Sequence, residues 1–243
     1  MGLTAKETTQ FTKTKRVEQD ELAVDSYPCR VAQVIDLGLQ TRDSWNQALN
    51  GGKGGFEVDT DKAPAPKIML TYEFTTEFMK DEAGNDVEDK PRWMSEDFHV
   101  FPLDNDLASS TKRYKGIDPH NIHKGNFAAL ANEPCTVTIG KKGNGKSKIG
   151  AVSPIMKGFV PAELKNPVKV FDLDNPDLEI FKSLPTWLQE KIQSNLEYAG
   201  SPLERLLGGA ETKPKDDKPK ADVKPQGVSQ EPESTTYGDD EPW

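Results

Sequence analysis

Apolar and polar positions alternate in several stretches of the chain, the pattern that predicts β-strands. The clearest run covers residues 67–79 and puts one set of large side chains on a single face: Ile68, Leu70, Tyr72, Phe74 and Phe78. The other face carries Lys67, Thr71, Glu73 and Thr75, so we predict a half-buried strand. A second alternating run, residues 92–103, follows an acidic turn, and the two runs together predict a long hairpin.

Three further strands are predicted around this hairpin. Residues 29–39 are β-branched and apolar, and Gly38 within them marks a bulge or bend. Residues 133–140 and 146–155 alternate on either side of a glycine-rich turn, and residues 103–119 have helical character. Residues 41–66 are rich in glycine and proline, which predicts a long loop with no element of its own.

The pattern changes to a helical one beyond residue 160. Apolar residues recur there at the four-residue spacing of one helix face: Leu184, Leu188, Ile192 and Leu196. Ser201 and Glu204 form a capping box that opens a last short helix. From Ala210 the chain is dominated by Lys, Pro, Asp and Glu, a composition typical of disordered segments.

Strand, hairpin, helix, hairpin is the order of elements in an OB-fold. This fold is a five-stranded barrel that presents strands 2 and 3 and two of its loops to oligonucleotides. We therefore predict a mainly β chain with added α structure. Its parts are a flexible N-terminal arm (1–25), an OB-fold domain (26–158), a helical extension (159–209) and a disordered acidic tail (210–243).

Overall charge argues against nucleic-acid binding, but the charge distribution does not. The chain has 31 Lys and Arg against 40 Asp and Glu, a formal net charge of −9, whereas phosphate binding normally needs a basic face. Acidic residues gather at 81–89 and 239–241, while basic residues gather at 112–115 and 141–148. A basic groove can therefore coexist with acidic appendages.

Cys29 and Cys135 lie within apolar alternation, which favours buried, reduced thiols over a disulfide or a metal site. No apolar run approaches the roughly 20 residues that a membrane span needs, and the first ten residues contain no apolar signal core. We expect a cytoplasmic protein without membrane contact.

The stretch Gly140–Ser147, GKKGNGKS, matches the spacing of a phosphate-binding P-loop. A working P-loop needs a helix that begins at its Lys-Ser pair, whereas the residues that follow here are β-branched and reach a proline at 154. The alternative is a basic hairpin turn, in which Lys141, Lys142, Lys146 and Lys148 project from the tip, and we favour it.

Two groups of residues are candidates for contact with a nucleic acid. Trp93, His99 and Phe101 could stack on unpaired bases or pack under the long loop or the C-terminal helices. Trp45, the fourth aromatic candidate, lies in the long loop itself and is exposed unless that loop folds down. The basic group near the predicted helix fits either phosphate contact or a solvated helix face: Lys112, Arg113, Tyr114 and Lys115.

Candidate metal and catalytic residues form no recognised pattern. His120, His123 and Cys135 do not have the spacing of a structural zinc site. The sequence contains neither a nucleophile elbow nor a zinc-protease signature. We expect no metal, no cofactor and no enzymatic activity.

The chain resembles single-stranded DNA-binding proteins of bacteriophages that have the OB-fold. The resemblance rests on PCRVAQVIDLG, on the MLTYEF and RWMSEDFHVFPL pair, on STKRYK, on NFAALANEPCTVTIGKK and on the terminal DDEPW. It covers about residues 27–155 and the tail, and its motifs are loose. The helical extension is not part of the common core, and the tail is unusually long and lysine-rich.

The resemblance implies sequence-independent coating of single strands during phage replication and recombination in the bacterial cytoplasm. In such proteins an acidic tail ending in an aromatic residue recruits a polymerase, helicase or nuclease. The residues that match that tail are Asp239, Asp240, Glu241 and Trp243. The predicted C-terminal helices pack either on the barrel or on a partner subunit, which would make a homo-oligomer. The alternative is a structural or scaffolding protein of a phage complex that binds no nucleic acid.

Overall fold

The computed structural model describes residue 17 and residues 19–208, all within the compact unit Met1–Gly209. Residues 1–16 of the predicted arm lie outside the described residues. So does the predicted tail, 210–243, with its four candidate partner-binding residues.

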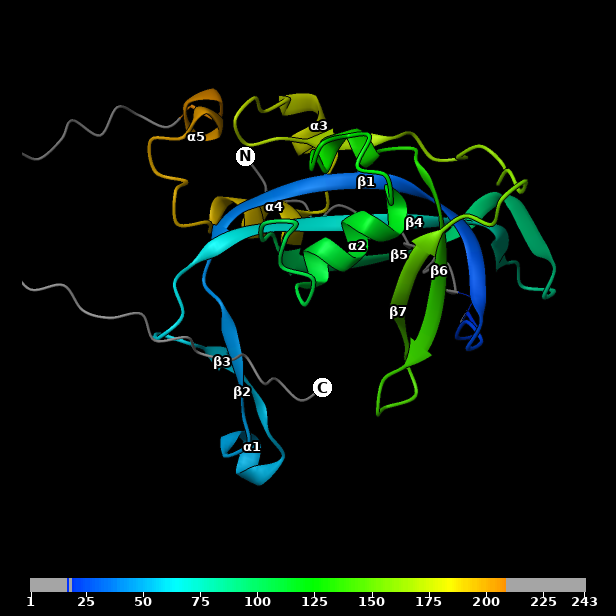
Figure 1. Cartoon of the computed structure of the whole chain (residues 1–243), viewed down its shortest axis with the longest axis horizontal. Helices are drawn as coiled ribbons and strands as arrows, with labels where there is room; N and C mark the ends of the chain where they lie inside the picture. Colours follow the sequence, from blue (N-terminus) through cyan, green and yellow to red (C-terminus); the bar gives the residue numbers. More distant parts are fainter. Residues whose placement is uncertain (1–16, 18, 209–243) are drawn as a thin grey trace, which may run out of the picture. The chain divides into compact units, whose positions relative to one another are not determined.

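A six-stranded sheet is the framework of the described part (Figure 1). Five strands lie in the order β5-β4-β1-β6-β7 with antiparallel neighbours, and the sixth pairs parallel with β1. The mainly β prediction is thus confirmed. The strands are β1 (Ser26–Gln40), β4 (Ala65–Lys80), β5 (Asp86–His99), β6 (Pro134–Lys141), β7 (Ser147–Pro154) and β8 (Lys169–Phe171).

The sheet is not closed between its two end strands, β5 and β7. Among the described residues no ladder joins β5 to β7, so the sheet does not close into the predicted barrel. The short strand β8, which the sequence analysis did not predict, lies instead beside the middle of β1, from Gln33 to Ile35.

Strand β4 is buried on both faces at its centre. Leu70, Tyr72 and Phe74 are fully buried, as their alternation predicts. Thr71 and Glu73, expected on a solvated face, are also only 2% and 1% exposed. The half-buried prediction was therefore wrong for this part of the strand, because a second layer covers its polar face.

The predicted irregularity at Gly38 is confirmed. The register of β1 against β4 shifts between Asp36 and Gly38, and Gly38 has a φ of +72°. A Cβ at this position would lie 2.6 Å from the Asn195 side chain. Only glycine combines this backbone conformation with so close a neighbour.

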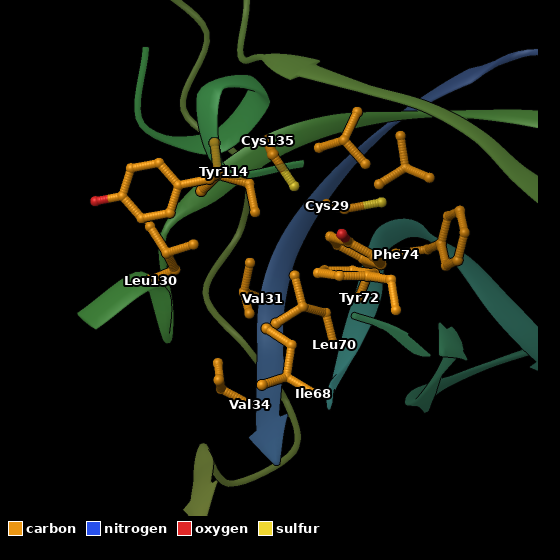
Figure 2. Packing of buried hydrophobic residues seen from close by; sticks show 14 of the residues in the cluster. Cys29, Val31, Val34, Ile68, Leu70, Tyr72, Phe74, Tyr114, Leu130 and Cys135 are labelled. Carbon is orange, nitrogen blue, oxygen red and sulfur yellow. The ribbon is translucent and has the colours of Figure 1, made fainter. Parts of the chain in front are cut away.

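The first core cluster fills one face of the sheet (Figure 2). Residues from β1, β4, β6 and β7 pack there against helix α2 (Ser109–Ile117) and the 3₁₀ turn η1 (Ala128–Leu130). Cys29 and Cys135 are paired positions of β1 and β6, and both are free, buried thiols as predicted. Burial raises the pKa of both thiols, that of Cys135 to about 12.

The second core cluster lies between the sheet and the C-terminal extension. Three short helices form this layer: α3 (Leu178–Lys182), α4 (Thr186–Gln193) and α5 (Pro202–Leu206). Their apolar side chains pack against Ile35, Leu37 and Met69 of the sheet. Leu184, Leu188 and Ile192 of the predicted stripe are buried. Leu196 is 53% exposed, because α4 has ended before it.

Two charged side chains fasten the start of the extension to the sheet. Glu73 accepts hydrogen bonds from the backbone N–H groups of Lys165 and Asn166 and from the Asn166 amide. Arg30 donates to the backbone carbonyls of Pro161 and Ala162 and pairs with Glu163 at 3.0 Å. These contacts explain why both charged groups can be buried.

The predicted long loop contains a hairpin of its own. Strands β2 (Asp43–Asn46) and β3 (Gly55–Val58) pair antiparallel, with the short helical segment α1 (Leu49–Gly52) between them. Figure 1 shows this hairpin projecting from the end of the β1–β4 ladder. The prediction of a segment without elements was wrong.

Residues 19–25 pack on the sheet, although the predicted flexible arm extends to residue 25. Leu22 is 4% exposed and belongs to the first core cluster. Gln19 exchanges hydrogen bonds with the backbone of Lys80, and Glu21 accepts one from the backbone of Ser147.

We predict that Glu73→Ala lowers the free energy of unfolding, measured by urea denaturation. The change leaves the amides of residues 165 and 166 without their acceptor, at about 1–3 kcal/mol for each buried donor. Glu82→Ala is the control, since this exposed carboxylate should change stability by less than about 0.5 kcal/mol. Equal effects of the two substitutions would show that Glu73 does not anchor the extension.

Candidate functional site

The GKKGNGKS stretch is the turn between β6 and β7. The Lys142 and Gly145 amides close it with hydrogen bonds of 2.8 Å, and Gly145 has a φ of +81°. Ser147 begins strand β7, so no helix N-terminus is present to hold a phosphate. The hairpin interpretation is confirmed.

The four lysines of this hairpin differ in their surroundings. Lys141 donates from Nζ to the Leu22 carbonyl at 2.6 Å and to the Ser147 hydroxyl at 3.1 Å. Lys142, Lys146 and Lys148 are exposed, and their ammonium groups make no ion pair with any residue that the structure describes. These three cations are therefore available to an external anion.

A cleft of about 270 Å³ lies between β5 and this hairpin. It occupies the place where the sheet stays open, because β5 and β7 do not pair. Its lining combines residues of both walls: Met94, Ser95, Glu96, Asp97, Lys142, Ser147, Lys148 and Ile149.

The two carboxylates of the cleft are already neutralised. Glu96 accepts hydrogen bonds from Arg113 Nε at 2.7 Å and Nη2 at 3.0 Å, and a third from the Tyr72 hydroxyl. Asp97 pairs with Lys67 at 3.2 Å and with Lys191.

Asp97 remains ionised despite its partial burial. Burial raises the pKa of its carboxyl group, but the hydrogen bonds and charges of Lys191 and Lys67 outweigh this and hold the pKa below its ordinary value. The two acids of the cleft therefore have partners of their own, and Lys142 and Lys148 give the cleft an excess of positive charge.

The predicted aromatic residues occupy two places on the surface. Trp93 lies on β5 opposite Glu73 of β4, one residue from the cleft lining, and is 50% exposed. Trp45 lies on β2, 55% exposed, with its ring edge-on to that of Phe56 at 5.2 Å between centroids. Phe56 is 72% exposed and was missed by the sequence analysis, which placed it in a structureless loop.

His99 and Phe101 lie where the β2–β3 hairpin joins the sheet. His99 is half-buried and its Nδ1 is 3.2 Å from the Ala65 carbonyl, and burial lowers the pKa of its imidazole. The Arg42 guanidinium lies over the Phe101 ring at 5.1 Å from the centroid, a cation–π contact. Neither ring lines the cleft beside Lys142 and Lys148.

The residues of the predicted basic cluster on α2 do not form one continuous binding surface. Tyr114 is fully buried, and its hydroxyl donates to Asp118 and accepts from the Gly125 amide, so it cannot stack on a base. Arg113 is engaged by Glu96, and Lys115 pairs with Asp106 at 2.5 Å. The expectation of phosphate contacts was wrong for Arg113, because its guanidinium serves a carboxylate inside the protein.

The C-terminal extension partly covers the outer face of β4 and β5, which is the face that carries Glu73 and Asp97. Residues 165 and 166 lie on Glu73, and Lys191 of α4 reaches Asp97. An oligonucleotide therefore cannot follow the whole face of these strands, which the OB-fold interpretation assigned to it. The accessible surface is the edge of β5 with the cleft beside it.

The described part of the chain contains neither a metal-binding cluster nor a membrane-spanning helix. In residues 19–208 no group of three or more His, Cys, Asp or Glu side chains is arranged to hold a metal ion. His123 contacts Glu133 at 3.1 Å, and Cys135 lies in the core. No helix of the described part is long and apolar enough to span a bilayer.

Comparison with known proteins identifies no relative: no family model, no curated protein and no solved structure matches this chain.

We predict that Arg113→Met lowers the free energy of unfolding by about 2–4 kcal/mol in urea denaturation, because it leaves the partly buried Glu96 carboxylate unpaired. Adding Glu96→Gln should restore part of the loss, since the amide can still accept from Tyr72. Lys146→Met on the exposed turn is the matched control and should change stability by less than about 0.5 kcal/mol. An Arg113→Met variant as stable as this control would contradict a structural role for the ion pair.

Proposed function

We propose that this protein binds single-stranded DNA without sequence preference. One observation carries the proposal: at the open edge of the sheet a cleft is lined by Lys142 and Lys148, while its carboxylates are paired with other cations. Such a site binds the phosphate backbone, which is common to all sequences. The half-exposed Trp93 beside it supplies a surface for base stacking, which tolerates any base.

The order of elements supports an OB-fold as the framework. Strands β1, β4, β5, β6 and β7 follow the OB order, with α2 between the third and fourth. In this assignment the barrel is left open between its third and fifth strands. The β2–β3 hairpin then replaces the loop between strands 1 and 2, and the lysine turn is the loop between strands 4 and 5.

The resemblance to phage single-stranded DNA-binding proteins supports a role in phage DNA replication and recombination in the bacterial cytoplasm. The acidic tail, with Asp239, Asp240, Glu241 and Trp243, would recruit a polymerase, helicase or nuclease. Its carboxylates carry the same charge as the phosphates that the cleft accepts, so an unoccupied tail competes with DNA. The proposal includes no catalytic step and no cofactor.

We predict that replacing Lys142 and Lys148 together by alanine weakens binding of a labelled oligothymidylate in fluorescence anisotropy. Each lost phosphate contact should reduce the slope of log K against log salt concentration by about 0.7, so the double variant loses about 1.4. Lys182→Ala is the control, since this exposed lysine lies on α3 and lines neither the cleft nor a neighbouring hollow. An unchanged slope would overturn the assignment of the cleft.

We predict that removing residues 237–243 tightens oligonucleotide binding at low salt and abolishes capture of the replication partner. The physical reason is the loss of an intramolecular competitor whose effect is screened as salt rises. A matched variant replaces the three acids by their amides and keeps Trp243. Unchanged affinity and unchanged capture would refute the role of the tail, and a parent protein that binds no oligonucleotide would favour the scaffolding alternative.

A further inference from the structure

A second hollow of about 180 Å³ adjoins the cleft. It lies between helix α4 and the sheet, and three of its lining residues, Ser95, Glu96 and Asp97, also line the lysine cleft. The two hollows therefore meet along one stretch of β5. The remaining lining residues come from the sheet and from α4: Leu37, Met69, Trp187, Leu188 and Lys191.

Helix α4 holds one aromatic ring at this hollow. Leu188 and Ile192 are 1% and 0% exposed and fix the helix in the second core cluster. Trp187 and Lys191, four residues apart, share the flank of the helix that borders the hollow. Lys191 pairs with Asp97 and ties this flank to β5. The Trp187 ring therefore lies on a helix that is already fixed in the core. Binding through this ring requires little further ordering of the protein.

Trp187 is half-exposed although its helix is packed on the sheet. Its side chain is 57% exposed, and its ring stacks on no other aromatic ring of the described residues. A large aromatic residue held half-exposed on a rigid helix is typical of stacking platforms for unpaired bases. The hollow is smaller than the roughly 300–1,000 Å³ of sites that enclose a drug-sized ligand, so one planar base fits it better than a whole nucleotide.

The charges around the hollow suit a polyanion. Lys67 and Lys191 together exceed the single charge of Asp97, and Arg113 cancels that of Glu96. Lys142 and Lys148 lie across the adjoining cleft, on the β6–β7 hairpin. A chain of phosphates can therefore continue from the lysine turn toward α4 past Glu96 and Asp97, whose charges are already paired.

We propose that the C-terminal extension is the second wall of the DNA groove, in which Trp187 stacks on a base of a single strand whose phosphates lie on the lysines of the β6–β7 turn. This inference rests on the proposed function and assigns a binding role to the layer that covers the sheet. It predicts a strand path that crosses β5 instead of running along the outer face of β4 and β5.

The test is oligothymidylate binding by the full chain with Trp187→Ala, with Trp187→Phe and with the control Leu206→Ala. Leu206 is 51% exposed on α5 and lines neither hollow. We expect Trp187→Ala to weaken binding by about 5- to 140-fold, the equivalent of about 1–3 kcal/mol for one stacked base. Trp187→Phe should retain most of the affinity, and Leu206→Ala should match the parent.

A second measurement does not depend on the alanine variant being folded. In a chain with Trp45, Trp93 and Trp243 changed to phenylalanine, oligothymidylate should quench the remaining Trp187 fluorescence. If the parent binds DNA while Trp187→Ala binds equally well or Trp187 is not quenched, the inference is overturned and the proposed function stands. If the parent binds no oligonucleotide, the proposed function fails. If Trp187→Ala instead converts a dimer to a monomer in sedimentation, the ring contacts a second copy and the inference is wrong.

Discussion

The ion pair between Arg113 and Glu96 determines both the shape and the charge of the candidate site. Glu96 lies on the edge strand β5 and is held by Arg113 of α2 and by the Tyr72 hydroxyl of β4. The pair joins the helix to the sheet beside the open edge. It also neutralises Glu96, one of the two carboxylates that line the cleft. Without it, Lys142 and Lys148 would face an unpaired anion.

The second constraint is that the central strands β1 and β4 are buried on both faces. On one side the apolar residues of alternating strands pack with α2, and on the other the extension covers Met69 and Glu73. The strands at the two ends of the order, β5 and β7, expose many of their residues, and the cleft lies between them. The proposed binding site is therefore at this gap, with the lysine turn lining one hollow and Trp187 lining the adjoining one.

Local pattern predicted much of this fold because strand formation depends on nearby residues. The alternation of Leu70, Tyr72 and Phe74 placed β4, and Gly38 marked the bulge of β1. The β-branched residues after the lysine turn and Pro154 excluded a helix there, and β7 occupies that stretch. Each of these features is determined by the residue itself or by neighbours one or two positions away.

Features that depend on distant partners were not predicted. Nothing local to Glu73 indicates that residues 165 and 166, more than 90 positions away, will satisfy its carboxylate. Tyr114 was misassigned because its charged neighbours suggested a surface, whereas Ser110, Thr111 and Ile117 share its buried helix face. The β2–β3 hairpin was not predicted because its glycine-rich composition is typical of loops. Trp187 could not be identified as a candidate from sequence, because its position depends on the packing of α4 beside β5.

Photo-crosslinking tests the central claim, that single-stranded DNA lies in the cleft between β5 and the β6–β7 turn. An oligonucleotide containing 4-thiothymidine would be irradiated with the full chain, and the modified peptides mapped by mass spectrometry. We expect adducts in residues 93–97 and 142–148, with far fewer from a duplex of the same sequence. Adducts confined to the β2–β3 hairpin, or no more adducts from the single strand than from the duplex, would contradict the account.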